Sequence, residues 1–451
     1  MSRPRKKNSI TPSVATIRVT HKYRAYPTVL QEYTIENWLF ILCSVYNHAI
    51  EERAEGYKNT GETISYSAQQ NALPVLRKAD PALRKVHSQV LQDCLQRVDK
   101  AYQKFFEDLK QKKAGAKIKV GYPRRKKLEK YRSLTYPQVW MKSKDRLTEN
   151  IKIRSGEDRR SALVILPGIG GMNIRVHRAV DWRNAKTVTL KREASGAWYI
   201  CVSVEKELVP TVSDNGKTTG VDVGLHKAVA TSDGNFAEHP KFINKAERRL
   251  RKAQKVLSRR EKGSANYQKQ KGILARRHER VANRRRDFLH KLSLWLVLSY
   301  SYIAFEKLNI AAMVKNPHLA KAILDAGWGS LIRLTSYKSV MLRGNEVVRV
   351  NPAYTTQECS KCGARVPKTL TERIHKCPQC GLVLDRDTNA ANVIEERAFG
   401  SSTVGRDLPE PTVLAVNACG DGTSAASASA VSLVVDPGSP DYNVASAFSR
   451  G

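Results

Sequence analysis

The 451-residue chain carries 78 Lys and Arg against 42 Asp and Glu, a formal net charge of +36. This much positive charge repels itself in a compact fold, so a polyanion such as nucleic acid is the expected partner. No run approaches the roughly 20 apolar residues that span a bilayer, which argues against a membrane partner. The first residues are basic and polar, without a secretory apolar segment, which favours a reducing cytoplasm.

The first half of the chain predicts a helical block placed within a set of strands. Residues 15–23 alternate apolar and polar side chains, as a strand does. From about 28 to 113, apolar residues recur at helical spacing, which predicts three or four helices interrupted at Pro74 and Pro81. Short runs rich in Val, Ile and Thr between 133 and 210 predict a small antiparallel barrel. The helical block is then an insertion after the first strand.

A different organisation begins at Thr218. Its expected elements are two strands within 220–231, two long basic helices at 244–260 and 267–291, strands at 302–306 and 345–350, and a helix that begins near Asp387. Strands interleaved with helices predict an α/β domain.

Two basic segments are candidates for contact with nucleic-acid backbones. Residues 245–291 hold 18 Lys and Arg and only four acids, too unbalanced for a helix pair that is merely solvated. A shorter run begins at Arg124, where a loop tip without a partner is nearly as good an explanation. The candidate contact residues are Arg124, Arg125, Lys126, Arg248, Arg249, Arg284, Arg285 and Arg286.

Two Cys-x-x-Cys pairs, separated by 14 residues, predict a structural zinc site. The ligands would be Cys359, Cys362, Cys377 and Cys380. Gly363 and Gly381 follow the two pairs and would let the chain turn tightly under a metal. The chain has 8 cysteines, too few for a disulfide scaffold, and the other four are scattered. Four cysteine ligands leave no open position for water, so the zinc would not be catalytic.

Three acids at the ends of predicted elements suggest a second metal site. Asp222 lies within an apolar strand, Glu306 ends the strand 302–306, and Asp387 opens a helix. Buried carboxylates need a partner charge or a metal, and three together would repel one another unless divalent cations lay among them. Two Mg²⁺ ions about 4 Å apart can activate water and stabilise the leaving oxygen of a phosphodiester.

Simpler roles for these acids remain open at this point. Asp387 could be only the N-cap of its helix, and Asp385 is a rival for the metal-binding role. Glu306 could be a surface residue at the end of a strand. Asp222, between Val221 and Val223, is the hardest of the three to explain by structure alone.

Residues 401–451 differ in composition from the rest of the chain. They hold two basic and five acidic side chains, so the first 400 residues carry a net charge of +39. The segment is rich in Ser, Ala and Gly and cannot bury enough apolar surface to offset its ordering entropy. We expect a disordered tail that is outside the functional core.

Four motifs resemble those of the TnpB family, transposon-associated RNA-guided nucleases related to the compact type V CRISPR effectors. They are Gly220-Val-Asp-Val-Gly-Leu, Ile303-Ala-Phe-Glu-Lys-Leu-Asn, Tyr354-Thr-Thr-Gln-Glu-Cys-Ser-Lys-Cys-Gly and Asp385-Arg-Asp-Thr-Asn-Ala-Ala-Asn-Val-Ile. Tyr46-Asn47 and the segment 121–138 are weaker matches. The resemblance spans about residues 17 to 398. The family's third acid directly precedes x-Asn-Ala-Ala, which favours Asp387 over Asp385.

The resemblance implies an α+β multidomain fold. A β-barrel wedge domain with an inserted helical recognition lobe would precede an RNase H-like (RuvC) α/β nuclease domain, which carries an inserted zinc ribbon. The implied segments are 1–27 for the first wedge strand, 28–120 for the recognition lobe, 121–215 for the wedge barrel, 216–353 and 381–400 for the nuclease domain, 354–380 for the zinc ribbon and 401–451 for the tail.

The implied activity is RNA-guided DNA endonuclease. A noncoding guide RNA would direct Mg²⁺-dependent hydrolysis of target double-stranded DNA next to a short flanking motif, with Asp222, Glu306 and Asp387 as catalytic acids. We expect a monomeric ribonucleoprotein in a prokaryotic cytoplasm, associated with the nucleoid. The alternative is a DNA- or RNA-binding regulator, or a transposition accessory protein, without cleavage. A strand-joining transposase is disfavoured because no helix-turn-helix domain is recognisable.

Overall fold

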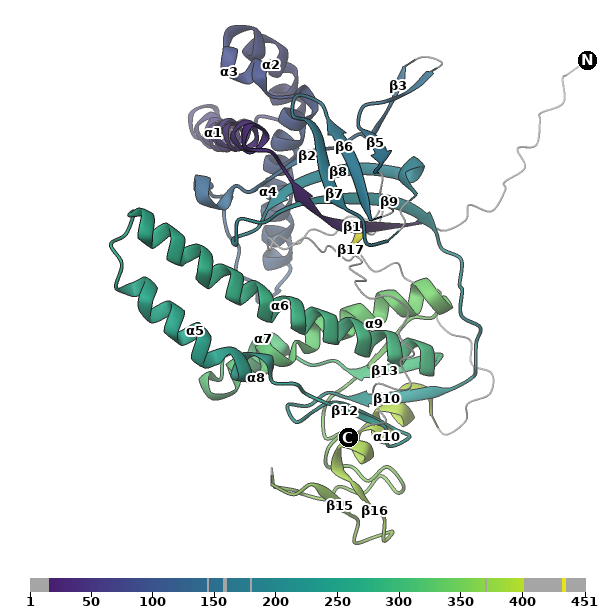
Figure 1. The fold of residues 1–451 in the computed structure, drawn as a ribbon. Helices are drawn as coiled ribbons and strands as arrows, with labels where there is room; N and C mark the ends of the chain where they lie inside the picture. The colour runs from purple at the N-terminus through teal and green to yellow at the C-terminus, as the bar shows by residue number, and fades with distance from the viewer. Residues whose placement is uncertain are drawn as a thin grey trace, which may run out of the picture. The chain divides into compact units, whose positions relative to one another are not determined.

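The computed structural model describes residues 16–143, 146–156, 160–178, 181–369, 371–400 and 432–434. The chain divides after Glu207 into two compact units, each described by itself (Figure 1). The tail expected at 401–451 lies outside the described residues except for β17 (Ser432–Val434). This strand pairs in parallel with β1 (Thr16–Tyr26), where the sequence predicted no strand.

The first unit contains the four predicted helices. They are α1 (Val29–Thr60), α2 (Tyr66–Ala79), α3 (Pro81–Lys85) and α4 (Ser88–Lys113). A capping box starts α1, because the Thr28 hydroxyl accepts the Gln31 N–H while the Gln31 side chain accepts the Thr28 N–H. Pro81 begins α3 as expected, but the predicted break at Pro74 is wrong. Pro74 lies on the exposed side of α2, where water can satisfy the carbonyl that the proline leaves unpaired.

The strands of the first unit form one curled sheet in the order β2-β8-β9-β1-β7-β6-β5, antiparallel throughout this path (Figure 1). The strands are β2 (Ser133–Tyr136), β5 (Lys152–Ser155), β6 (Ser161–Leu166), β7 (Gly170–Arg175), β8 (Ala185–Arg192) and β9 (Trp198–Glu207), with a separate hairpin of β3 (Trp140–Ser143) and β4 (Arg146–Glu149). Among the described strands no ladder joins β2 to β5. The Asn150 and Ile151 N–H groups, just before β5, donate to the Val139 carbonyl, just after β2, at 2.9 and 3.3 Å, so the edges of the curled sheet approach each other as in the predicted barrel without a continuous strand pairing.

The pairing of β1 with β9 confirms that the helices are inserted into the sheet. The two strands run antiparallel from Thr16 opposite Glu207 to Ala25 opposite Trp198. The helices share one apolar core with the sheet, which includes Trp38 and Leu91 from the helices and Ile200 from β9. Helical block and sheet are therefore one packed body.

The second unit is built on a mixed five-stranded sheet in the order β12-β11-β10-β13-β14. Its strands are β10 (Thr218–Asp222), β11 (Lys227–Thr231), β12 (Phe236–Glu238), β13 (Tyr302–Glu306) and β14 (Val348–Val350). The neighbours β10, β13 and β14 are parallel. In β13, Ile303 and Phe305 join one core cluster while Ala304 joins another, because both faces of the sheet are covered. This arrangement confirms the predicted α/β domain.

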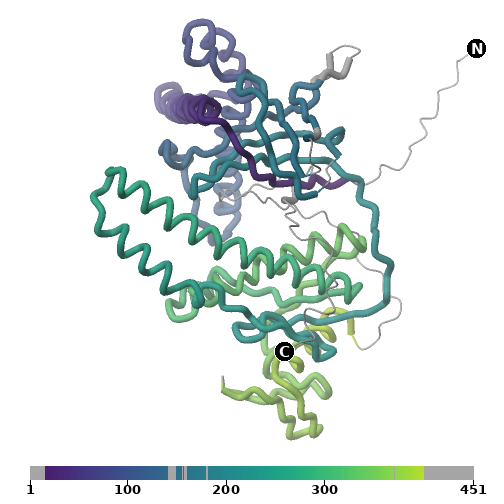
Figure 2. Tube along the Cα trace, in the orientation of Figure 1, coloured from purple at the N-terminus to yellow at the C-terminus, as the bar shows by residue number. Residues whose placement is uncertain are grey.

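Two long helices form the expected basic hairpin, α5 (Phe242–Ser258) and α6 (Ala265–Ser299) (Figure 2). Gly263 turns the chain with a φ of 95°, and the Ser264 hydroxyl caps α6. The sequence did not reveal α7 (Ile310–Met313), α8 (Pro317–Ala326) or α9 (Trp328–Arg343). Among the described residues, no helix combines the length and the apolar character that crossing a membrane requires.

Helix α10 (Arg386–Phe399) lies against the sheet at close range. A Cβ atom added to Gly220 of β10 would lie 2.0 Å from the Ala391 oxygen and 2.5 Å from the Glu395 nitrogen. Only glycine allows this approach of strand and helix. A short hairpin of β15 (Ile374–Lys376) and β16 (Val383–Asp385) leads into α10.

Candidate metal sites and nucleic-acid contacts

The structure brings Asp222, Glu306 and Asp387 to one region of the second unit. Asp222 ends β10, Glu306 ends the adjacent parallel strand β13, and Asp387 lies in the first turn of α10. Parallel strands end at the same edge of a sheet, which explains the convergence. Burial raises the pKa of Asp222 to about 8, helped by the negative charges of Glu306 and Asp387 and opposed by Arg386. Glu306 and Asp387 are therefore both close enough to Asp222 to affect its charge.

Glu306 is held by a residue that the sequence analysis did not single out. The carboxyl is buried, and the hydroxyl of Thr355 donates a hydrogen bond to its Oε1. Burial raises the pKa of Glu306, while this hydrogen bond and the charge of Arg397 act in the opposite direction. A buried, oriented carboxyl does not fit the alternative of a solvent-exposed strand end.

The roles of Asp385 and Asp387 are distinct. Asp385 is the N-cap of α10, because its Oδ1 accepts the N–H groups of Asp387 and Thr388 at 3.0 and 3.2 Å. Its carboxylate also pairs with Lys227 Nζ at 2.8 Å. Burial alone would raise the pKa of Asp385, but the hydrogen bonds from Lys227 and the backbone lower it. Asp387 is not the cap; its Oδ1 lies 3.6 Å from the Nε of Arg386, an ion pair that a bound cation would have to compete with.

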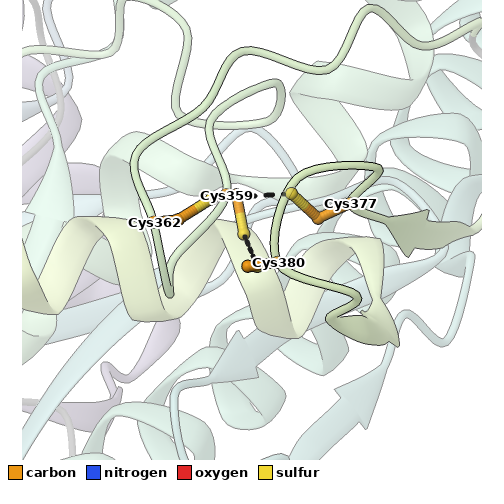
Figure 3. Close-up of side chains that lie close together, drawn as sticks. All are labelled: Cys359, Cys362, Cys377 and Cys380. Atoms are coloured by element: carbon orange, nitrogen blue, oxygen red, sulfur yellow. Dashed lines mark hydrogen bonds between the residues drawn. The ribbon is translucent and has the colours of Figure 1, made fainter.

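The four cysteines form the compact group that was predicted. The sulfur atoms of the four cysteines all lie within 4.8 Å of one another. Among the described residues, the carboxylates of Asp222, Glu306 and Asp387 do not form an equally tight group. Cys359 and Cys380 have their Sγ atoms 3.5 Å apart, as do Cys362 and Cys377 (Figure 3). A tetrahedral zinc with Zn–S bonds of about 2.3 Å requires similar spacings, so the cluster fits that ion.

Each cysteine pair closes a tight turn on a glycine. The Gly363 N–H donates to the Cys359 carbonyl at 2.8 Å, and the Gly381 N–H donates to the Cys377 carbonyl at 3.0 Å. Both glycines have positive φ, 71° and 69°, which confirms the reason for glycine after each pair.

Helix α10 anchors the cysteine module. The Asn389 side chain, fully buried, donates to the Glu358 carbonyl at 2.7 Å and accepts the Ser360 N–H at 3.1 Å. Arg397, two turns further on, donates to the Glu358 carboxylate at 2.5 Å and to the Asn351 carbonyl at 2.7 Å. The helix that carries Asp387 thus also fixes the backbone on either side of Cys359.

A comparison with known proteins decides the family. A protein of Streptomyces pristinaespiralis named putative RNA-guided DNA endonuclease is 31% identical over 411 residues, which are 90% of this chain and 92% of that protein. The putative RNA-guided DNA endonuclease InsQ of Escherichia coli is 29% identical, over 83% of this chain and 90% of that protein. The chain belongs to the TnpB family.

Three family models match parts of this TnpB-family chain. A model described as a probable transposase matches residues 199–317, and one described as a Cas12f1-like TNB domain matches 328–394 and contains the cysteine cluster. A third, described as a helix-turn-helix domain, matches 17–62, although the sequence analysis recognised none. There the structure has the strand β1 and the single 32-residue helix α1.

Solved structures share the fold of this TnpB-family chain. A Cas12f1–sgRNA–target DNA complex contains a chain that aligns with a TM-score of 0.54 at 13% identity, covering 81% of this chain and 82% of that one. The mini-RNA-guided endonuclease CRISPR-Cas_phi3 aligns with a TM-score of 0.51 at 10% identity, covering 88% and 95%. At these identities the likeness concerns the fold alone.

The loop at 124–127 is pinned to α1. Asn47 accepts the Lys126 N–H at 2.7 Å and donates to the Lys126 carbonyl at 3.0 Å. Lys126 also lies over the Tyr46 ring at 4.5 Å, and Arg125 pairs with Glu51 at 2.6 Å. The side chains of Arg124, Arg125 and Lys126 are exposed. The loop is thus a fixed basic surface, and its role in this TnpB-family protein stays a prediction.

The basic residues of α5 and α6 separate into two groups. Arg248, Arg249, Arg284 and Arg286 are exposed, and Arg248 lines a shallow groove along α5 with Arg251, Lys252 and Lys255. Arg285 instead pairs with buried Asp325, its Nη2 2.9 Å from Oδ1, and Asp325 Oδ2 accepts the Ile243 N–H at 2.9 Å. Arg285 therefore joins α6, α8 and the start of α5, and we do not propose it as a nucleic-acid contact.

Proposed function

We propose that this protein is an RNA-guided DNA endonuclease whose catalytic acids are Asp222, Glu306 and Asp387. The observation that carries the proposal is their convergence at one sheet edge, where burial and mutual repulsion raise the pKa of Asp222 to about 8. Such an arrangement costs stability in the absence of a cation and is typical of functional sites. The names of the relatives, RNA-guided DNA endonucleases, support the same activity.

The donor set suits magnesium, because hard cations prefer carboxylate oxygens. Asp222, Glu306 and Asp387 would hold the ions, and Thr355 would orient Glu306 by its hydrogen bond. Bound Mg²⁺ would activate water and stabilise the leaving oxygen of the phosphodiester. Asp385, paired with Lys227, would keep the start of α10, and with it Asp387, in position. Zinc in the cysteine cluster would be structural, because all four ligands are cysteines.

The proposed partners are a noncoding guide RNA and target double-stranded DNA. The net charge of +36 supports binding to both. We propose that 1–27 and 121–215, which include the sheet of the first unit, form the wedge domain and that 28–120 is the recognition lobe. The second unit would be the RuvC-like nuclease domain (216–353 and 381–400) with the zinc ribbon at 354–380. Exposed Arg124, Arg248 and Arg284 are examples of the proposed backbone contacts.

Purification from cells that carry the native flanking locus, followed by sequencing of the bound RNA, tests the guided activity. One dominant short RNA with a variable end is expected, and the purified complex should cut DNA that matches this end. Asp222→Ala and Glu306→Ala should abolish cutting and keep the RNA, whereas Glu238→Gln, an exposed acid on β12, should cut normally. Unchanged cutting by either alanine variant would refute the assignment of the acids. Bound DNA without any enriched RNA would refute the guided activity.

A further inference from the structure

A hollow of about 520 Å³ lies beside the edge strand β14 and is not used by the proposed chemistry. We name it the β14 hollow. It is lined by Val348, Arg349, Val350, Asn351, Ala353, Tyr354, Glu358, Arg365, Arg397 and Ala398. These residues come from the sheet edge, from the chain on either side of the first cysteine pair and from the end of α10.

Tyr354 has an unusual backbone conformation in this hollow. Its φ is +63°, a region that bulky side chains rarely occupy, at a cost of order 1–3 kcal/mol. Its carbonyl accepts the N–H groups of Gln357 and Glu358, both at 2.9 Å, so the turn that leads to Cys359 fixes this conformation. The side chain is 49% exposed. The fold therefore holds a large aromatic ring at the surface, where burial of the ring contributes little stability.

An arginine lies over this ring. The Arg365 guanidinium lies 3.9 Å from the centre of the Tyr354 ring. Aromatic rings and guanidinium planes are the two kinds of surface on which unpaired nucleobases stack. Both groups project from the irregular chain around the first cysteine pair, outside helices and strands.

The hollow is also positively charged. Three arginines, Arg349, Arg365 and Arg397, face one acid, Glu358. The Arg397 Nη2 lies 2.5 Å from Glu358 Oε2, and the Arg365 Nε lies 4.0 Å from Glu358 Oε1, so both arginines pair with this one carboxylate. Arg349 is exposed on β14, and the described part of the chain shows no acid paired with it. A net positive charge remains at Arg349, beside the stack, where a phosphate would be attracted.

We propose that the β14 hollow holds one nucleotide of a single strand, with its base against Tyr354 and Arg365 and its phosphate near Arg349. The inference rests on the proposed function, since it assigns part of the path of a nucleic-acid strand at the nuclease site. Thr355, next to Tyr354, donates to Glu306, and Val350 of the hollow is the strand partner of Glu306. A nucleotide held here would be adjacent to that acid. Stacking requires an unpaired base, which excludes an intact duplex.

Photocrosslinking of the assembled complex in Mg²⁺-free buffer, which leaves zinc in the cysteine cluster, tests the site without cleavage. The guide–protein complex with target DNA is prepared with 5-iododeoxyuridine in the DNA or, separately, 5-iodouridine in the guide, irradiated, digested and analysed by mass spectrometry. We expect a nucleotide adduct on the peptide that contains Tyr354, from one of the two labelled strands, which identifies DNA or RNA as the source. Tyr354→Leu should lose it. No adduct from either label, or adducts only at Phe236, an exposed ring outside the hollow, would overturn the proposal.

Cleavage rates provide the second measurement. At a limiting concentration of the guide–protein complex, Tyr354→Leu and Arg349→Gln should each cut about tenfold more slowly than the parent. Two control variants should cut like the parent: Tyr354→Phe, which keeps the ring, and Arg373→Gln, which changes an exposed arginine outside the hollow. Tyr354→Gly separates binding from folding, because it relieves the positive φ and should keep the parent's melting temperature while it cuts slowly. Parent-like cutting by both Tyr354→Leu and Arg349→Gln would refute the site. If the unmodified protein never cuts DNA, the proposed function is refuted instead. The photocrosslink would then still show whether a nucleotide binds in the β14 hollow.

Discussion

The Asn389 side chain binds the backbone on both sides of Cys359. It donates a hydrogen bond to the Glu358 carbonyl at 2.7 Å and accepts one from the Ser360 N–H at 3.1 Å. The same helical turn carries Asp387, two residues earlier. The position of the cysteine module is therefore coupled to the position of a candidate catalytic acid through one amide side chain.

Asn389→Ala should lower the melting temperature by several degrees, because two part-buried backbone groups, the Glu358 carbonyl and the Ser360 N–H, lose their hydrogen bonds, at about 1 kcal/mol each. The four thiolates are untouched, so zinc content should stay at one ion per chain while DNA cutting slows. Differential scanning fluorimetry, elemental analysis and a cleavage assay measure the three effects. Glu396→Ala, an exposed position on the same helix, is the control. A parent-like melting temperature for Asn389→Ala would contradict this coupling.

Asp222→Asn should make the protein more stable in the absence of Mg²⁺ while it removes activity. The substitution replaces a carboxyl that is disfavoured by burial and by Glu306 and Asp387 with a neutral group of the same shape. We expect a gain of about 1–3 kcal/mol at pH 8, measured by denaturant unfolding. Adding Mg²⁺ should stabilise the parent and not the variant. Equal stability of the two proteins in the absence of Mg²⁺ would show that the acids do not repel one another appreciably.

Gly220→Ala should disrupt the contact between β10 and α10. The new methyl group would overlap the Ala391 oxygen and the Glu395 nitrogen, both backbone atoms that side-chain rotation cannot move. A loss of about 3 kcal/mol or more is expected, seen as a lower melting temperature or poor yield of folded protein. Gly121→Ala, where no atom lies within 4 Å of the added carbon, should behave like the parent.

Removal of zinc should destabilise the second unit. Cys377→Ser removes one of four ligands, and its purified form should contain well under one zinc ion per chain and melt at a lower temperature. Treatment of the parent with a strong chelator should have the same effect, reversed by added zinc. Cys43→Ser, in the helix α1, should retain full zinc content. Full zinc content in Cys377→Ser would refute this ligand set.

Buried Lys338 should make stability depend on pH. Burial lowers its pKa to about 7, and its Nζ donates to the His290 carbonyl and the Ser293 hydroxyl. The unfolded chain keeps this lysine charged up to about pH 10, so the folded state gains stability as the pH rises from 7 towards 10. Lys338→Met should therefore stabilise most at pH 6, by about 2 kcal/mol, and progressively less at higher pH. An equal gain at pH 6 and pH 9.5, in denaturant unfolding, would contradict this assignment.

The predictions that the structure confirms rest on residues that are close together in the sequence. The cysteine pairs, the acid within an apolar strand and the basic helical hairpin are all patterns within a few residues of one another. Helix α9 was missed because the apolar stripe of Trp328, Leu331 and Ile332 gives way to buried polar residues from Thr335 onward. Arg285 could not be told from its neighbours, because its partner Asp325 is 40 residues away. The Thr355–Glu306 contact and the β14 hollow likewise depend on tertiary structure.

The close contact between Gly220 and α10 has a consequence for the timing of folding during translation. Strand β10 is synthesised about 170 residues before the helix that covers it, so the face of the sheet around Gly220 stays open until α10 leaves the ribosome. A nascent chain that stops earlier contains Asp222 and Glu306 but neither Asp387 nor Asn389. The proposed active site can then be assembled only after the chain has been synthesised beyond Asp387, so translation interrupted before that residue would release inert fragments rather than an unguided nuclease.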